Sequence, residues 1–186
     1  YKRQGLDYCY DKECIVTVGG SEAIDLAFRA IINPGDEVIL LQPSYVAYTP
    51  GVALAGGKVV NIELKEDNEF KLTPELLEAA ITPKTKAILL NYPSNPTGGF
   101  MTREDYEKIV SIIKKHEIIV ITDEIYAELS YEQKFCSIAA FDEIKDQVIL
   151  VSGYSKAYAM TGWRLGYVLA LSLIHISEPT RHLRIS

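Results

Sequence analysis

The sequence has 186 residues, of which 48% are hydrophobic and 24% are charged, as in ordinary globular proteins and unlike disordered or fibrous ones. Its 19 basic and 25 acidic residues give a formal net charge of −6, which argues against nucleic acid or an anionic membrane as the main partner. The apolar runs are far shorter than the ~20 residues that a membrane span needs. We therefore expect a cytoplasmic protein that folds around one core.

The three cysteines support the same compartment. Cys9, Cys14 and Cys136 have no metal-ligand spacing, and they are too few for a disulfide framework. This usage predicts a reducing environment and no metal site.

Both ends of the sequence are unusual. The chain starts with Tyr1 rather than Met, and its character changes at Leu171, where LSLIHISEPTRHLRIS begins. The first eleven of these residues resemble the translated read-through of a transposon-type sequencing-library adapter. We therefore expect residues 1–170 to form one domain, incomplete at both ends, and residues 171–186 to be a non-native tail. The alternative is a native strand that continues past Ala170.

Apolar runs of strand length recur along the chain, with amphipathic helical segments between them. Continuous runs rich in Val, Ile and Leu are typical of strands buried on both faces of a mostly parallel sheet, so the pattern predicts an α/β fold. The runs are Glu37–Leu41, Lys58–Leu64, Lys86–Asn91, Ile118–Thr122, Gln147–Ser152 and Arg164–Ala170.

Three helices carry start signals. Ser21 is the expected N-cap of a helix that stops at residues 33–35, Asn-Pro-Gly. Thr73 followed by Pro74 predicts a second helix through about Ile81. Thr102 with Asp105 predicts a third, through a capping box with Asp in place of Glu or Gln.

Polar residues follow three of the predicted strands. YPSNPTGG starts at Tyr92, DEIY at Asp123 and GYSKAY at Gly153, while Gly19-Gly20-Ser21 precedes the first helix. Ligands of open α/β sheets gather beyond the carboxyl ends of strands, and a helix N-terminus binds anions, so one pocket could collect these segments.

Each segment alone also has a purely structural explanation. The glycine pair can form a turn, Asp123 can cap a helix, Asn95-Pro-Thr-Gly98 can be a turn, and Lys156 can be a surface lysine. The phosphate-binding patterns GxGxxG and GxxxxGK[ST] do not match Gly19-Gly20-Ser21, so nucleotide binding has little support.

Together these segments resemble the class I and II aminotransferases, which use pyridoxal 5′-phosphate. The most specific element is SKAYAMTGWRLGY at residues 155–167, joined to NPTG at 95–98 and to Asp123-x-x-Tyr126. The resemblance covers residues 1–170, which correspond to the large cofactor-binding domain, and is strongest to the bacterial aspartate, aromatic and diaminopimelate branch. It implies a three-layer α/β/α sandwich of fold type I and a homodimer.

The resemblance also implies roles for individual residues. Lys156 would form a Schiff base with the cofactor aldehyde, its amine made nucleophilic by desolvation, and would later carry the proton of the substrate α-carbon. Asp123 would keep the pyridine nitrogen protonated, so that the ring accepts electrons. Asn95 and Tyr126 would hydrogen-bond the phenolic oxygen, and Tyr45 would stack on the ring.

A phosphate-binding group follows from the same resemblance. Arg164 would pair with the phosphate, assisted by Gly20, Ser21 and Ser155. Gly153 stands where a phosphate-binding serine is common in the family, so that hydrogen bond is not implied here.

Several neighbouring residues are expected to have no role in ligand binding. Trp163 is expected to serve packing, and Tyr48 and Tyr92, which we place in loops, are expected not to contact the ligand. Glu124 should point away from the Asp123 side chain if the strand alternation continues.

The reaction that the resemblance implies is transfer of an amino group from an L-amino acid to a 2-oxo acid. A pyridoxal phosphate-dependent C–S β-lyase of the same fold is the alternative enzyme, and the cofactor-sensing domain of a transcriptional regulator is the alternative outside catalysis. The 186-residue chain by itself is expected to be inactive, because the small domain and the substrate-carboxylate arginine would lie outside it.

Overall fold

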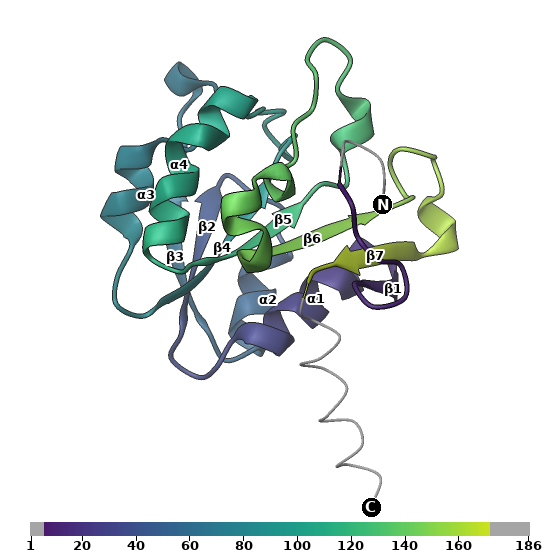
Figure 1. Ribbon diagram of the computed structural model, residues 1–186, viewed down its shortest axis with the longest axis horizontal. Coiled ribbons are helices and arrows are strands. Elements are labelled where there is room, and N and C mark those ends of the chain that lie inside the picture. Colours follow the sequence, from purple (N-terminus) through teal and green to yellow (C-terminus); the bar gives the residue numbers. More distant parts are fainter. Residues whose placement is uncertain (1–5, 172–186) are drawn as a thin grey trace, which may run out of the picture.

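The computed structural model describes residues 6–171 as a three-layer α/β/α sandwich (Figure 1). The strands of its central sheet are β1 (Cys14–Val18), β2 (Glu37–Gln42), β3 (Lys58–Glu63), β4 (Thr85–Asn91), β5 (Ile119–Asp123), β6 (Val148–Gly153) and β7 (Leu165–Leu169). They are arranged in the order β1-β7-β6-β5-β4-β2-β3. The five from β3 to β6 are parallel, whereas β7 is antiparallel to β6 and β1 to β7. The predicted α/β fold with a mostly parallel sheet is confirmed.

All six predicted strands are present, and each end lies within one residue of the prediction. The sequence prediction missed β1, which pairs only with β7 at one edge of the sheet. Val16 and Val18 in this strand are 68% and 61% exposed, so these two side chains lie outside the core.

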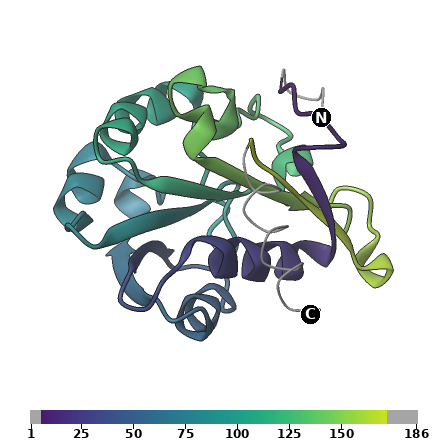
Figure 2. The ribbon, with the colours of Figure 1, turned by 60° about the horizontal axis from the view of Figure 1, so that its bottom comes forward.

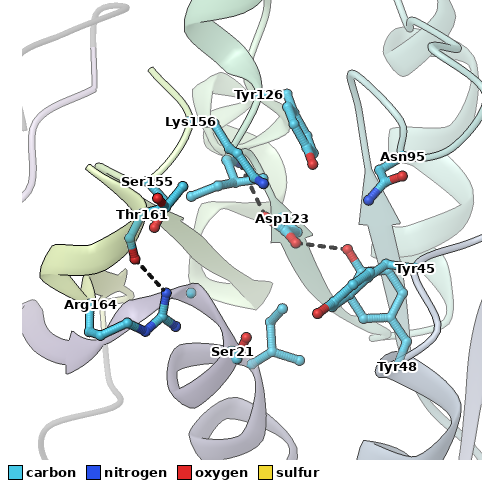
Figure 3. Close-up of a pocket in the computed structure, with 13 residues that line it drawn as sticks. Ser21, Tyr45, Tyr48, Asn95, Asp123, Tyr126, Ser155, Lys156, Thr161 and Arg164 are labelled. Atoms are coloured by element: carbon cyan, nitrogen blue, oxygen red, sulfur yellow. Dashed lines mark hydrogen bonds between the residues drawn. The ribbon is translucent and has the colours of Figure 1, made fainter. Parts of the chain in front are cut away.

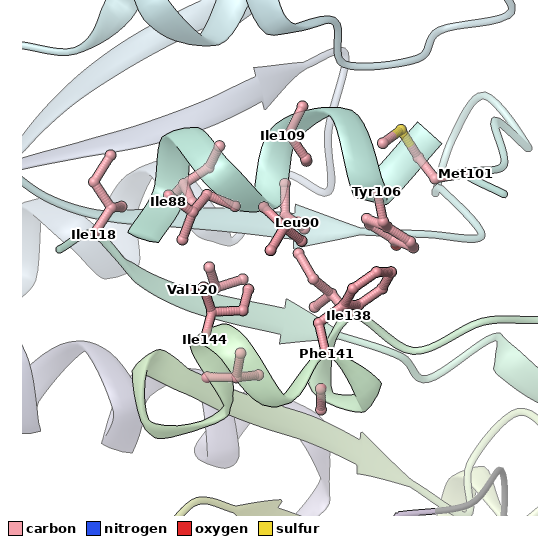
Figure 4. Packing of buried hydrophobic residues seen from close by; sticks show 14 of the residues in the cluster. Ile88, Leu90, Met101, Tyr106, Ile109, Ile118, Val120, Ile138, Phe141 and Ile144 are labelled. Atoms are coloured by element: carbon pink, nitrogen blue, oxygen red, sulfur yellow. The ribbon is translucent and has the colours of Figure 1, made fainter. Parts of the chain in front are cut away.

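Helices cover both faces of the sheet (Figure 2). One face carries α1 (Gly19–Ile31) and α2 (Tyr48–Leu54), and the other carries α3 (Pro74–Ala80), α4 (Arg103–Lys115) and the 3-10 turns η4 (Ile138–Ala140) and η5 (Asp142–Gln147). Each face has its own apolar core. On the α4 side, Ile88, Leu90 and Val120 of the sheet pack against Tyr106, Ile109 and Phe141 (Figure 4).

Two of the three predicted helix starts are confirmed. Thr73 caps α3, with Pro74 at its first position, and Thr102 and Asp105 form a capping box at α4. The N-cap prediction for Ser21 is wrong, because α1 begins at Gly19, with Val18 as its N-cap. The Val18 side chain makes no capping hydrogen bond, and the Glu22 carboxylate accepts one from the Val18 amide.

The described part of the chain bears on two further expectations. Within residues 6–171, no helix combines the length and the apolar character that crossing a bilayer would require. Leu171 packs partly buried against the α4-side core, and the remainder of the predicted tail, residues 172–186, lies outside the described residues.

Candidate active site

A pocket of about 320 Å³ lies at the carboxyl ends of β4, β5 and β6, beside the N-terminus of α1 (Figure 3). The structure brings all nine predicted site residues to it, from segments up to 144 positions apart, counted from Gly20 to Arg164. They are Gly20, Ser21, Tyr45, Asn95, Asp123, Tyr126, Ser155, Lys156 and Arg164. Four other residues, Ile24, Tyr48, Ile125 and Thr161, also line the pocket.

Asp123 is the last residue of β5, and its side chain is buried at the base of the pocket, with 6% of its surface exposed. Its Oδ2 accepts a hydrogen bond of 2.7 Å from the Tyr48 hydroxyl, and its Oδ1 accepts one of 3.1 Å from the Ile125 amide. Burial raises the pKa of Asp123, while these two hydrogen bonds oppose that rise. The carboxylate is therefore oriented before any ligand binds.

The prediction that Tyr48 lies in a loop is wrong, and its side chain lines the pocket. Tyr48 starts α2 rather than lying in a loop, and it is 1% exposed. Its ring also meets Tyr45 edge to face, with centroids 5.6 Å apart. Tyr45 itself is 38% exposed and packs on the buried Tyr48, so the Tyr45 ring offers an aromatic surface to the pocket.

Asn91 is a positioning residue that the sequence reasoning missed. It ends β4, and its Nδ2 donates a 3.0 Å hydrogen bond to the Asp123 carbonyl. Its Oδ1 accepts a 3.0 Å hydrogen bond from the Asn95 amide. One buried amide therefore fixes Asn95 relative to the end of the neighbouring strand, a link that only the pairing of β4 with β5 creates.

Lys156 follows β6 in the loop that carries SKAY. Its Nζ lies 5.8 Å from the centroid of the Tyr126 ring, within cation–π range. The Lys156 side chain is exposed, whereas its neighbour Ser155 is buried. The expected desolvation of the amine is therefore not supplied by the described residues of this chain.

The end of the pocket away from Asp123 and Lys156 has the hydrogen-bond donors and the positive charge that bind an anion. The amides of Gly20 and Ser21 belong to the first turn of α1, where backbone donors lack partners within the helix. Arg164 reaches the same place, and its Nη1 donates to the Thr161 carbonyl at 3.1 Å. Arg164 has a left-handed φ of 50°, an uncommon conformation for a residue with a side chain.

Gly19 makes room for the Arg164 side chain. A Cβ on Gly19 would lie 2.3 Å from Arg164 Nη2, and the φ of Gly19 is +76°. A side chain at Gly19 would displace the guanidinium from its place at the start of α1, and the positive φ also favours glycine here.

Two more glycines allow β7 to pass close to the site. A Cβ on Gly166 would lie 2.4 Å from the Gly19 carbonyl carbon, and one on Gly153 would lie 2.9 Å from the Leu165 carbonyl oxygen. A side chain at Gly153 would therefore require the main chain of β7 to shift.

The packing role expected for Trp163 is not found. Its side chain is 75% exposed at the end of the 3-10 turn Thr161–Trp163. Within residues 6–171, Trp163 does not line the pocket.

The pocket therefore has two chemically different ends. Arg164 and the N-terminus of α1 provide positive charge and free amide donors, which suit a phosphate or another compact anion. Asp123 provides a buried carboxylate at the base, which suits a protonated ring nitrogen, and the Lys156 amine lies beside the Tyr126 ring (Figure 3). The space lies in the range of small-ligand sites, about 300–1,000 Å³.

Comparison with known proteins points to one family. The sequence model of the family "Aminotransferase class I and II" matches residues 2–183. YugH of Bacillus subtilis, whose name places it among the aminotransferases, is 52% identical over 92% of this chain and 45% of its own length. The aspartate aminotransferase of Geobacillus stearothermophilus is 45% identical over 88% of this chain and 42% of its own length.

Solved structures agree with the sequence matches. The aromatic aminotransferase of Pyrococcus horikoshii superposes with a TM-score of 0.90 at 40% identity, over 93% of this chain and 47% of that one. The chain thus spans somewhat less than half the length of the relatives that it matches.

Proposed function

We propose, since this chain belongs to the class I and II aminotransferase family, that the full-length protein carrying it transfers an amino group from an L-amino acid to a 2-oxo acid, using pyridoxal 5′-phosphate. The observation that supports this best is the convergence of an amine, a buried carboxylate and an anion-binding helix start on one pocket. The homodimer and the division of the chain at residue 170 remain predictions.

The donor set of the pocket fits the proposed cofactor at each of its functional groups. Arg164, Ser155 and the first turn of α1 would hold the phosphate, and Asp123 would face the pyridine nitrogen. Tyr45 would cover the ring, while Asn95 and Tyr126 would reach the phenolic oxygen. When bound, pyridoxal phosphate supplies an aldehyde that condenses with amines and a ring that accepts electrons from the substrate α-carbon.

Lys156 has two proposed tasks. Its Nζ would hold the cofactor covalently in the resting protein, and it would move the proton of the substrate α-carbon during turnover. The Lys156 amine is exposed in the described residues, so it can reach both an incoming cofactor and a substrate.

Asp123 has an electrostatic task. A carboxylate buried at 6% exposure and held by Tyr48 and Ile125 keeps its negative charge in one place, where water screens it little. That fixed charge would favour a proton on the facing nitrogen atom. The hydrogen bonds to Asp123 thus serve the proposed chemistry directly.

The substrates remain open, because the named relatives of similar identity act on different amino acids. At 45% and 41% identity the relatives are named aspartate aminotransferases, and at 38% one is named an aromatic-amino-acid aminotransferase. None of the nine pocket residues would distinguish these donors, since all nine are assigned to the cofactor.

Single-turnover spectroscopy of the full-length protein tests the proposal. The cofactor-loaded protein is mixed with L-aspartate, an aromatic L-amino acid or cystathionine, and the products are quantified. We expect about one equivalent of 2-oxo acid per site from at least one donor, without ammonia, as a half-reaction of amino transfer requires. Release of pyruvate and ammonia would contradict amino transfer and favour the β-lyase.

A further inference from the structure

The residue after Asp123 is a buried carboxyl group that the proposed chemistry does not use. Glu124 is 2% exposed and lies on the sheet face opposite the pocket, as the alternation predicted. Its Oε1 accepts hydrogen bonds from Ser137 Oγ at 2.6 Å and from Thr122 Oγ1 at 3.3 Å. Among residues 6–171, its Oε2 has no hydrogen-bond partner. Burial of such a group is costly, so a function is expected.

The main chain of Glu124 connects β5 to β6. Its amide donates to the Val151 carbonyl at 2.9 Å, and its carbonyl accepts from Ser152 Oγ at 3.3 Å. The main chain of Glu124 therefore fixes the end of β5 to β6, while its side chain is bound to Ser137.

The side chain extends the connection to η4. Ser137 Oγ, which donates to Glu124, also accepts a 3.1 Å hydrogen bond from the Ala139 amide. Ala139 is 1% exposed and Ile138 is fully buried in the α4-side core, so the anchor is rigid.

The segment that Glu124 anchors carries two pocket residues. Asp123 precedes Glu124, Tyr126 follows it by two positions, and the Ile125 amide between them donates to Asp123 Oδ1. A rotation of this turn would move the Asp123 carboxylate and the Tyr126 ring together.

We propose that Glu124 is a positioning residue for the cofactor pocket, whose carboxyl group ties the turn 123–126 to Ser137 and thereby sets the orientation of Asp123 and Tyr126. This inference rests on the proposed function, because it assigns the two residues their roles toward the cofactor. It adds a residue that touches neither cofactor nor substrate.

The chemistry of the buried group suggests a matched pair of variants. Burial, reinforced by the nearby charge of Asp123, raises the pKa of Glu124 to about 8, so the neutral acid predominates at pH 7. An amide has nearly the same shape and retains an oxygen that accepts from Ser137. Glu124→Gln should therefore preserve the anchor, and Glu124→Ala should remove it.

The test compares these variants in the full-length protein with Ile144→Ala, a change at a buried residue of the same core whose side chain cannot form hydrogen bonds. Ser137→Ala is added as a milder way to remove the 2.6 Å hydrogen bond, should Glu124→Ala fold poorly. One readout is amide hydrogen exchange of the peptide 123–127 without cofactor. The other is the pH titration of the absorbance of the lysine-bound cofactor.

We expect Glu124→Ala and Ser137→Ala to speed exchange in this peptide by about tenfold and to move the midpoint of the titration by about half a unit or more. Glu124→Gln should match the wild type in exchange at pH 7, where Glu124 is mostly neutral, and in the part of the titration below pH 8. Ile144→Ala should lower thermal stability without changing either readout. Wild-type behaviour of both the Glu124→Ala and Ser137→Ala proteins, or the same changes in Ile144→Ala, would overturn the inference.

The two proposals fail in different ways. If the wild type forms no lysine-bound absorbance, the proposed function is wrong, and the cofactor part of this inference is wrong with it. If that absorbance forms and the variants titrate as the wild type does, only the role of Glu124 is wrong.

Discussion

The hydroxyl of Tyr48 donates a hydrogen bond of 2.7 Å to Asp123 Oδ2, across 75 positions of the sequence. Tyr48 is almost fully buried, so water cannot take its place at the carboxylate. Burial alone would favour the neutral form of Asp123, and this hydrogen bond favours the charged form. The first turn of α2 therefore helps to keep a negative charge under the pocket.

Replacement of Tyr48 by Phe should weaken cofactor binding. The change removes a hydrogen bond to a charged group, which contributes about 1.5–3 kcal/mol, so the affinity for pyridoxal phosphate should fall about tenfold or more. The measurement is an absorbance titration of the full-length apoprotein with the cofactor.

Tyr92→Phe is the matched control. Tyr92 is also buried, and its hydroxyl donates a 2.9 Å hydrogen bond to the Phe70 carbonyl, away from Asp123. Its replacement should leave the affinity for the cofactor unchanged. Equal losses of affinity in both variants would show that Tyr48 acts only through stability.

Gly166→Ala should disrupt the anion-binding end of the pocket. The new Cβ would meet the main chain of Gly19 at 2.4 Å and the Gly20 amide at 2.7 Å, and main-chain atoms cannot move aside cheaply. Overpacking of this kind costs about 1–3 kcal/mol or more, and it would displace the start of α1. Affinity for pyridoxal phosphate should fall more than affinity for pyridoxal, which lacks the phosphate.

Gly162→Ala provides the comparison for Gly166→Ala. It lies two residues before Arg164, and nothing stands within 4 Å of its added Cβ. Both affinities should stay at the wild-type level in this variant. A Gly166→Ala protein that binds both vitamers normally would contradict the close approach of β7 to α1.

Thr102→Ala should destabilise the fold without affecting the site. It removes the capping box in which Thr102 Oγ1 accepts from the Asp105 amide at 3.2 Å and Asp105 Oδ2 accepts from the Thr102 amide at 3.1 Å. The free energy of unfolding should fall by about 1 kcal/mol in urea denaturation. Ser111→Ala, at an exposed position within α4, should leave it unchanged or slightly higher.

The free energy of unfolding should decrease as the pH rises from mildly acidic to mildly alkaline, because Glu124 loses its proton. Its pKa is raised from 4.5 to about 8 in the folded state, so its stabilising contribution is complete below pH 4.5 and is lost as the pH rises through 8. The loss should be on the order of a few kcal/mol relative to Glu124→Gln. The titratable groups close enough to interact with the charge of Glu124 are Asp123, Tyr8, Tyr106 and Cys136.

Denaturation of wild type and Glu124→Gln at a series of pH values measures this difference. Because the variant retains Asp123, Tyr8, Tyr106 and Cys136, the difference between the two curves isolates Glu124. Parallel curves from pH 5 to pH 9 would contradict a raised pKa at this position.

The sequence was sufficient for those parts of the structure that follow from local pattern or from a contiguous motif. Apolar runs located six strands, and short motifs located nine of the 13 residues that line the pocket. Features that depend on contacts between distant segments could not be predicted from the sequence. Asn91 and Tyr48 reach Asp123 only after β4, β5 and α2 have come together, and β1 is a strand only because β7 pairs with it.

The most direct test of the account concerns the Lys156 amine. The protein with bound pyridoxal phosphate is reduced with borohydride, digested and examined by mass spectrometry, alongside Lys156→Ala and Lys134→Ala, the latter another exposed lysine. We expect the cofactor on the peptide that contains Lys156, with yellow absorbance that persists in Lys134→Ala and disappears in Lys156→Ala. A label on any other lysine, or absorbance that survives in Lys156→Ala, would contradict the proposed site.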